Sequence, residues 1–427
     1  MMVRCGVVPV LLLFLAACSR PNREPVDAAI QAEVNRIRAI DNHAHPARTV
    51  RNGPPDRDFD ALPVDNLEPA SDPLRLRPGA PLFAEAAHSL FGEPSRKSQI
   101  QREKGDSYPA WVLDQIGVDT MLANRVALGP GIQPPRFRWI AYIDALMFPL
   151  DNTQLAARNS DRKAFFALED RLRARYLAES GLDHPLATLA SYLARVVTPA
   201  LERHKQGGAL AEKFEAAYLR SLQFDAVDRA AADRIYAQFI GKSTPSEAEY
   251  KPLQDYLFHY IAAECGRLGM AVHLHTGEGG GSYFDMTGAN PMRLESVLND
   301  PSLRKTRFVM LHGGWPFDRQ IAALLEKPNA YLDFSFQDLA RPPAALAATL
   351  REWLAWVPEK ILFGTDAYPY SDQIGWEESG WVAAHNARQA LAIALTGMMR
   401  DGEISRDRAF ELARLVLREN ARKLYGL

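Results

Sequence analysis

Residues 41–45 read Asp41-Asn42-His43-Ala44-His45 and end an apolar-rich run that starts at Val34. An apolar run that ends in His-x-His predicts a short β-strand, because alternate side chains of a strand point to the same face. His43 and His45 would then direct two nitrogen ligands from the C-terminal end of the strand toward one spot. On its own the pair is also compatible with a chance surface feature, or with two separately satisfied core histidines.

Three later stretches share this design, in which an apolar run ends in a ligand-type residue and is followed by small or turn-forming residues. Five of the ten histidines of the chain lie in these four stretches, so chance scatter explains them poorly. The later stretches are Met270–His275 before Thr276-Gly277, Phe308–His312 before Gly313-Gly314, and Ile361–Asp366 before Ala367.

The chain is predicted to contain eight strands, most of them separated by helices. This order favours a parallel sheet, and eight parallel strands close into a TIM-type (β/α)8 barrel, an α/β fold. Ligands at the ends of strands one, five, six and eight would meet in the cup where such barrels carry their chemistry. The predicted strands are the run that ends at His45, Val118–Asn124, Phe137–Asp144, Ala209–Leu219, Met270–His275, Phe308–His312, Asn329–Ser335 and Lys360–Asp366.

Two stretches interrupt this series of strands. Residues 46–107 contain repeated prolines and no clean period, which predicts a long proline-rich loop after the first strand. That loop either covers the site as a lid or forms a partly ordered surface excursion. Residues 159–204 have helical periodicity and predict a helical insertion between the third and fourth strands. Because the strands resume directly afterwards, residues 28–427 are predicted to form a single barrel domain.

The N-terminus has the features of an export signal. Arg4 is followed by the apolar run Val7–Ala17, which is too short to span a bilayer as a mature helix. The end of this run, Leu15-Ala16-Ala17-Cys18, resembles the lipobox of bacterial lipoproteins, which implies removal of residues 1–17 and lipidation of Cys18. Residues 18–27 would then be a tether, and the protein would be lipid-anchored at the bacterial cell envelope, facing the periplasm. An uncleaved anchor or a misread start is the alternative.

The composition is that of an ordinary globular protein, with 47% hydrophobic and 24% charged residues. A formal net charge of −2 gives no general reason to expect a nucleic acid as partner. With Cys18 lipidated, Cys265 is the one free thiol of the mature chain, so a disulfide within that chain is excluded.

The donor set at the strand ends suits a divalent metal ion. We predict His43, His45, His275 and Asp366 as ligands, with Asp366 also able to take the proton of an attacking water. Three imidazoles and one carboxylate match zinc and are a poor match for calcium, while iron, manganese and nickel are also compatible. An ion with an open position lowers the pKa of its bound water to about 7, which supplies a nucleophile at neutral pH.

Two further histidines have predicted roles next to these ligands. His312 is either a ligand of a second ion or the group that stabilises an oxyanion or transfers a proton, and a buried packing role is the alternative. His273 shares a strand face with His275, so we expect it one layer deeper in the barrel, behind the ligands.

Three charged residues have competing interpretations. Lys213 lies in the predicted strand Ala209–Leu219, whose alanine and glutamate content also suits a helix. It is a carbamylated bridge between two ions, a binder of an anionic substrate, or a solvated helix lysine. Arg220 is a candidate to bind a substrate carboxylate. Glu278 lies in the loop after His275 and is expected to be solvated.

Taken in order, several of these motifs resemble the amidohydrolase superfamily, specifically its amidohydrolase-related branch. The resemblance covers the chain from about residue 37 to the end, except the two interrupting stretches. It implies a TIM-type barrel, a divalent metal on His43, His45, His275 and Asp366, and His312 at the sixth-strand position. His273 departs from the branch, and Lys213 lies in no firmly matching motif. The motifs are residues 40–46, His275-Thr276-Gly277, Leu311–Gly314, Gly364-Thr365-Asp366 and Glu419–Arg422.

Three functions follow from these features. The first is metal-dependent hydrolysis of an amide, C–N, ester or lactone bond in a small molecule by a metal-activated water. The second is a decarboxylase of the same fold, because the branch contains both hydrolases and non-oxidative decarboxylases of small aromatic or unsaturated acids. The third, of another class, is a non-catalytic periplasmic binding lipoprotein that retains the barrel.

Overall fold

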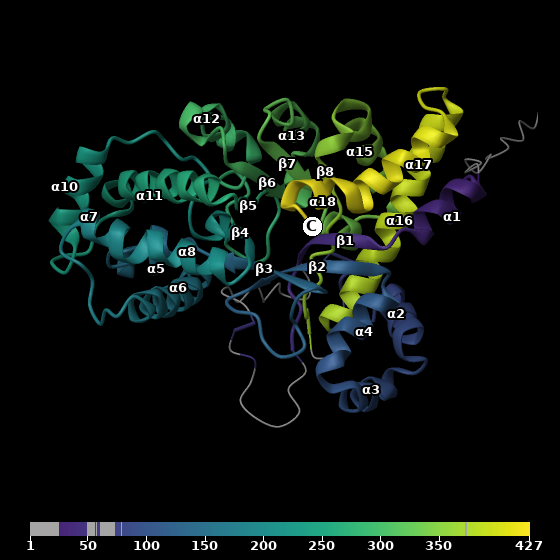
Figure 1. Ribbon diagram of the computed structural model, residues 1–427, viewed down its shortest axis with the longest axis horizontal. Helices are drawn as coiled ribbons and strands as arrows, with labels where there is room; N and C mark the ends of the chain where they lie inside the picture. Colours follow the sequence, from purple (N-terminus) through teal and green to yellow (C-terminus); the bar gives the residue numbers. More distant parts are fainter. Residues whose placement is uncertain (1–24, 49–55, 57, 60–72, 78, 372–373) are drawn as a thin grey trace, which may run out of the picture.

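The computed structural model describes residues 25–48, 56, 58–59, 73–77, 79–371 and 374–427 (Figure 1). The predicted export signal, Cys18 and residues 18–24 of the predicted tether lie outside the described residues. Residues 25–27, which we also assigned to the tether, belong to the fold. Asp27 caps the first helix by accepting hydrogen bonds from the backbone N–H groups of Ala29 and Ile30, and it pairs with Arg406 at 2.7 Å.

Eight parallel strands form one sheet in the order β1 to β8, each hydrogen-bonded to the next along the chain. The sheet curls into a nearly closed barrel with helices around it, so the predicted fold class is confirmed (Figure 1). The strands are β1 Ala39–Ala44, β2 Val118–Arg125, β3 Phe137–Tyr142, β4 Ala209–Phe214, β5 Ala271–His275, β6 Arg307–Leu311, β7 Ala330–Asp333 and β8 Ile361–Leu362.

The helices pack outside the sheet or cover its ends. They are α1 Ala28–Arg36, α2 Pro81–Phe91, α3 Lys97–Lys104, α4 Tyr108–Gln115, α5 Thr153–Ala156, α6 Ser160–Glu179, α7 Leu189–Tyr192, α8 Thr198–Gln206, α9 Ala216–Leu219, α10 Arg229–Phe239, α11 Glu247–Leu268, α12 Glu295–Asn299, α13 Asp318–Leu324, α14 Gln337–Ala340, α15 Pro343–Trp356, α16 Trp376–Arg400, α17 Arg406–Arg414 and α18 Asn420–Tyr425.

The barrel closes between its first and last strands. Ala44 forms a parallel bridge with Ala367, just beyond β8. The backbone N–H of Asn42 donates to the carbonyl oxygen of Phe363 at 2.9 Å, and that of Asp366 donates to the carbonyl oxygen of His43 at 2.8 Å. These bonds place the first and last predicted ligand strands side by side.

The lower half of the barrel is filled by apolar side chains and closed by the C-terminal helix. One buried cluster contains side chains from seven of the strands, and Ala421 and Leu424 of α18 pack against them. The hydroxyl of Tyr425 donates to Oδ1 of Asn42 and lies 2.7 Å from Nε2 of His273. The strand members are Ile40, Leu122, Ile140, Ala211, Ala271, Val309, Leu311 and Leu362.

The first strand starts at Ala39, after α1 ends at Arg36. One predicted strand end needs correction. The fourth strand ends at Phe214 rather than Leu219, since residues 216–219 turn into α9. Helix α11 starts at Glu247, where Ser246 and Glu249 form a capping box.

The prediction of a loop over all of residues 46–107 is wrong for its second half. Residues 81–91 and 97–104 form α2 and α3, which lie with α4 beside α16 (Figure 1). Lys97 pairs there with Glu378 at 2.7 Å and with Glu377 at 3.2 Å. Pro81 occupies the first turn of its helix, where the missing N–H costs nothing, so proline did not mark a loop.

The helical insertion between the third and fourth strands is present. Helices α5 to α8 occupy residues 153–206, and α6 starts after Asn159, whose side chain accepts from the backbone N–H of Arg162. These teal helices project from one side of the barrel in Figure 1. Within the described part of the chain, no helix is long and apolar enough to cross a membrane.

The contacts of the Tyr425 hydroxyl with Asn42 and His273 lead to a prediction about stability. We expect Tyr425→Phe to lower the free energy of unfolding by about 1–3 kcal/mol, because it leaves buried polar atoms of Asn42 and His273 without a partner. The matched control is Tyr283→Phe, at a tyrosine that is 59% exposed. Urea unfolding followed by circular dichroism measures both, and equal midpoints for the two variants would contradict the prediction.

Candidate metal centre

Three of the predicted ligands converge at the open end of the barrel. The ligand atoms of His43, His45 and Asp366 all lie within 4.8 Å of one another. Nε2 of His43 is 3.1 Å, and Nε2 of His45 is 3.3 Å, from Oδ1 of Asp366. Both imidazoles are buried, while the side chain of Asp366 is 16% exposed. The group is therefore enclosed by protein but reachable through its carboxylate.

The backbone holds Asp366 in this position through the two residues before it. Asp41 accepts hydrogen bonds from the backbone N–H of Thr365 at 3.0 Å and from its hydroxyl at 2.6 Å. A Cβ on Gly364 would lie 2.9 Å from Oδ2 of Asp333, so only glycine fits there. Asp366 itself has φ 52°, a left-handed conformation that is rare for a non-glycine residue and typical of strained functional positions.

The protonation states suit ligand chemistry. Burial lowers the pKa of His43 well below its usual range, and the charge of Lys213 lowers it further, so this imidazole is neutral. Burial would raise the pKa of Asp366, but the neighbouring His43 and hydrogen bonds from both imidazoles lower it well below its usual range. A neutral nitrogen beside an ionised carboxylate is the state in which both bind a cation.

Buried polar groups behind the histidines fix their other ring nitrogens. The side-chain amide of Asn124 lies 2.5 Å from Nδ1 of His43, and the hydroxyl of Tyr142 lies 3.1 Å from Nδ1 of His45. Oδ1 of Asn124 is buried and has no hydrogen-bond partner among the described residues. Since amide O and N are assigned from such networks, turning the amide lets Oδ1 accept from Nδ1–H of His43. That arrangement frees Nε2 to bind an ion, so the residues present fit a divalent metal.

His312 lies beside this cluster. Its Nδ1 is 3.9 Å from Oδ2 of Asp366, on the side of the carboxylate that does not face His43 and His45. Asp333 fixes it by accepting from its backbone N–H at 2.9 Å, and Ser335 contacts its Nδ1 at 3.0 Å. His312 has φ 63°, so it is held in the same unusual conformation as Asp366. Burial lowers its pKa to about 4.

His275 lies near the cluster but is not one of its members. Among the described residues, those members are His43, His45 and Asp366. Its Nε2 lies 3.0 Å from the carbonyl oxygen of Glu278, and its Nδ1 lies 3.0 Å from Nε2 of His312. The structure thus corrects the expectation that His275 joins the same tight group, and its role as a ligand stays a prediction. A Cβ on Gly277 would collide with the backbone of Gly314 and Trp315, which explains the glycine after this strand.

His273 lies one layer deeper, where it was predicted. It is fully buried, its Nε2 contacts the hydroxyl of Tyr425, and burial lowers its pKa to about 3.

Lys213 is not a solvated helix lysine, because it lies on β4 and is fully buried. Its Nζ pairs with Glu215 at 2.9 Å, and the other oxygen of Glu215 is 3.6 Å from Nδ1 of His275. Two more buried acids extend this group toward the insertion: Asp144 accepts from the backbone N–H of Glu215 at 2.7 Å, and Glu169 belongs to α6. Burial raises the pKa of both Asp144 and Glu169.

Two other predictions need correction. The guanidinium of Arg220 is buried and donates to Gln254, Asp255 and two backbone carbonyl groups, so the structure uses it in packing against α11 instead of presenting it to a substrate. Glu278 is not freely solvated. Burial, with the nearby charge of Asp366, raises its pKa to about 8.

Sequence reasoning missed the buried groups that orient the ligands, namely Asp41, Asn124, Tyr142, Glu215, Asp333 and Ser335. Asp41 and Asp333 had a usable signal, because each is a carboxylate at or near the end of a predicted strand. Asn124 ends a predicted strand, and Tyr142 lies near the end of the next. Glu215 had no such signal, since it follows a strand whose end was placed too late.

Together, the fold and the site define a metal-dependent, hydrolase-like enzyme built on a TIM-type barrel. The model of the amidohydrolase family matches residues 173–427, more than half of the chain. The chain belongs to this family. The matched range contains His275, His312 and Asp366, whereas His43 and His45 precede it.

One curated protein and several solved structures are similar to this chain. Protein fluG of Emericella nidulans is 30% identical over 194 residues, which are 43% of this chain and 21% of that protein. The chain thus spans about a fifth of the length of that relative.

Among solved structures, a Lactobacillus casei protein described as a metal-dependent hydrolase has 19% identity and a TM-score of 0.66, over 93% of this chain and 97% of that one. Glucuronate isomerase from Caulobacter crescentus has 13% identity and a TM-score of 0.62, over 93% of each chain. Uronate isomerase from Thermotoga maritima has 12% identity and a TM-score of 0.58, over 93% and 96%. These likenesses show the fold.

The ligand cluster predicts the metal content. We expect about one divalent ion per purified chain, lost in His43→Ala and in Asp366→Ala because each removes a donor of the three-residue group. The control is His184→Ala, whose histidine side chain is 75% exposed. Elemental mass spectrometry measures the ion. Two ions per chain would assign Lys213 to a bridging role, and no uptake on reconstitution would contradict the site.

The contact of Asn124 predicts a separate effect on metal affinity. We expect Asn124→Leu to weaken metal binding about 10–100-fold, because His43 loses the group that orients its ring. Asn124→Asp keeps an oxygen that accepts from Nδ1–H, so its affinity should stay closer to that of the wild type. Competition with a chelator measures both values, and equal affinity in wild type and Asn124→Leu would contradict the assignment.

Proposed function

We propose that this enzyme hydrolyses an amide, C–N, ester or lactone bond of a small molecule. The observation that carries the proposal is the meeting of His43, His45 and Asp366 with His312 on the free side of the carboxylate. Two imidazoles and one carboxylate suit a zinc-like ion, which we infer to be the cofactor.

When bound, the ion would polarise the carbonyl group of the substrate and lower the pKa of a water molecule beside it. Asp366 is ionised and its side chain is 16% exposed, so it is placed to take the proton of that water. Nδ1 of His312 lies 3.9 Å from Oδ2 and the ring is neutral, so its N–H can stabilise the charge that develops on the substrate oxygen and donate a proton to it.

A count of protons supports His275 as a further ligand. Ser335 donates its hydroxyl hydrogen to Asp333 at 2.7 Å, so Nδ1 of His312 must carry its proton to pair with Ser335. Nε2 of His312 then accepts from Nδ1–H of His275. Nε2 of His275 is then unprotonated, and its lone pair faces the backbone carbonyl oxygen of Glu278, which is also an acceptor. A cation relieves this contact, and an unprotonated Nε2 is what a ligand histidine requires.

Aromatic rings around the cluster support a substrate with a flat, apolar part. The ring of Tyr368 lies 5.5 Å from that of His45, and the ring of Tyr218 lies 4.6 Å from that of His275. Phe59 and Phe284 add a second row behind these tyrosines, with ring centroids 5.8 Å and 4.9 Å away. Such rings bury apolar area and stack on planar groups.

Export is proposed on the sequence alone. Arg4, the apolar run and the lipobox-like Leu15-Ala16-Ala17-Cys18 support cleavage before Cys18 and attachment to the cell envelope through lipid. We propose that one domain follows this anchor, and its start near Pro25 agrees with the packing of Asp27.

A substrate screen tests the reaction class. The zinc-loaded enzyme is given aryl amides, esters and lactones, with acid release as readout, and hydroxybenzoates, with carbon dioxide as readout. We expect acid release that requires both the ion and Asp366. Carbon dioxide without consumption of an ester or amide would assign the decarboxylase reaction instead, and no turnover by a metal-loaded protein would favour a binding protein.

His312 gives a sharper prediction on any substrate that is found. We expect His312→Asn to lower kcat about 10²–10⁴-fold with metal content unchanged, because a proton-transfer group is lost while the three-residue cluster remains. His88→Asn, at an exposed histidine of α2, is the control. An unchanged kcat would show that His312 only packs.

A further inference from the structure

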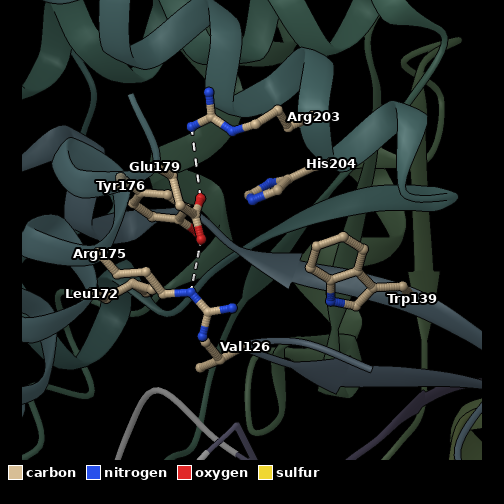
Figure 2. Close-up of a pocket in the computed structure, with 8 residues that line it drawn as sticks. All are labelled: Val126, Trp139, Leu172, Arg175, Tyr176, Glu179, Arg203 and His204. Atoms are coloured by element: carbon tan, nitrogen blue, oxygen red, sulfur yellow. Dashed lines mark hydrogen bonds and ion pairs between the residues drawn. The ribbon is translucent and has the colours of Figure 1, made fainter. Parts of the chain in front are cut away.

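A second cavity lies outside the barrel wall, between β3 and the helical insertion (Figure 2). None of its lining residues belongs to the metal centre. Helix α6 contributes four of them and α8 contributes two, and the other two come from the end of β2 and from β3. The lining residues are Val126, Trp139, Leu172, Arg175, Tyr176, Glu179, Arg203 and His204.

The size and walls of the cavity suit a single aromatic ring. Its volume is about 210 Å³, and an engineered apolar cavity of about 150 Å³ is large enough to admit benzene. Trp139 and His204 meet edge to face with ring centroids 5.0 Å apart, and the ring of Tyr176 lies 5.5 Å from that of His204. Val126 and Leu172 complete the apolar part of the lining.

The charges of the lining are unevenly matched. Arg175 pairs with Glu179 at 2.9 Å and with Asp58 at 2.6 Å. Arg203 lies 3.7 Å from the same Glu179, a contact that Figure 2 marks with a dashed line. It also donates to Oγ of Ser180 at 3.4 Å. Its Nε is buried without a hydrogen-bond partner among the described residues. Arg203 is therefore the lining cation with capacity for another acceptor.

His204 is a polar lining residue whose Nδ1 is already paired with an acid. Its Nδ1 lies 3.0 Å from Oε1 of the buried Glu212, which fixes the proton on that nitrogen. Asp58 and Glu179 both pair closely with Arg175, whereas Arg203 has only long contacts with Glu179 and Ser180. This incomplete pairing of Arg203 favours an anionic ligand, and a carboxylate matches the fork of a guanidinium better than a point anion does.

We propose that this cavity is a second small-molecule site that binds a one-ring aromatic carboxylate. The ring lies among Trp139, Tyr176 and Leu172, and the carboxylate pairs with Arg203, replacing its two long contacts by a charge-assisted hydrogen bond. The site is separate from the metal centre, yet close to it. Tyr176 donates its hydroxyl hydrogen to the carbonyl oxygen of Tyr142, whose own hydroxyl contacts His45.

The test uses 4-fluorobenzoate as the probe, observed by fluorine NMR with the purified full chain. We expect saturable binding that Arg203→Gln weakens about tenfold or more, because the charged partner of the carboxylate is lost. Arg171→Gln removes an exposed arginine from α6, the helix that contributes four of the lining residues, and should leave the affinity unchanged. The neutral 4-fluorobenzamide has the same ring, and we expect it to bind more weakly than the acid and to be insensitive to Arg203→Gln.

Two additional variants keep the result interpretable. Asp366→Asn disables the metal centre, so retained binding in this variant places the probe elsewhere. Leu172→Phe fills the cavity without a change of charge and should also abolish binding, which matters if Arg203→Gln perturbs the fold. Equal affinity in wild type and Arg203→Gln, loss of binding in Asp366→Asn, equal affinity for the amide, or no saturable binding at millimolar probe would each overturn the proposal.

Discussion

The site depends on the seam at which the barrel closes. The backbone N–H of Asp366 donates to the carbonyl oxygen of His43, and that of His45 donates to the carbonyl oxygen of Ala367 at 2.8 Å. Residues more than 300 positions apart are thereby held in one register. Three donors from opposite ends of the chain cannot meet by local structure alone, so the barrel has to close before the metal centre exists.

Buried carboxylates that bind no ion secure this seam. Asp41 ties the strand that carries His43 to Thr365, and Asp333 ties His312 to Asn42 and Ser335. Burial raises the pKa of Asp41 to about 7 and that of Asp333 to about 6, which shows the cost of keeping charge inside the barrel. Their hydrogen bonds compensate for part of that cost and hold His312 and Asp366 at positive φ.

The sequence predicted those features that follow from period and position. Apolar runs ending in His43, His275, His312 and Asp366 located four strand ends, because strand period and the polarity of a parallel barrel determine where side chains meet. Features set by packing were missed. The orientation of His275 depends on its contact with Glu278, and the burial of Lys213 depends on its pairing with Glu215. The helix that starts at Pro81 was missed because a proline is tolerated in the first turn of a helix.

The insertion is integrated into the barrel and is not an appendage. Tyr176 of α6 hydrogen-bonds the backbone of β3 at Tyr142, the same residue whose hydroxyl contacts His45. Glu169 of the same helix is buried near Asp144, which holds the backbone of Glu215. Polar groups buried from both sides of the strand wall must be satisfied together, because either side alone would leave the other without partners. The geometry of the metal centre therefore depends on helices that contribute no ligand to it.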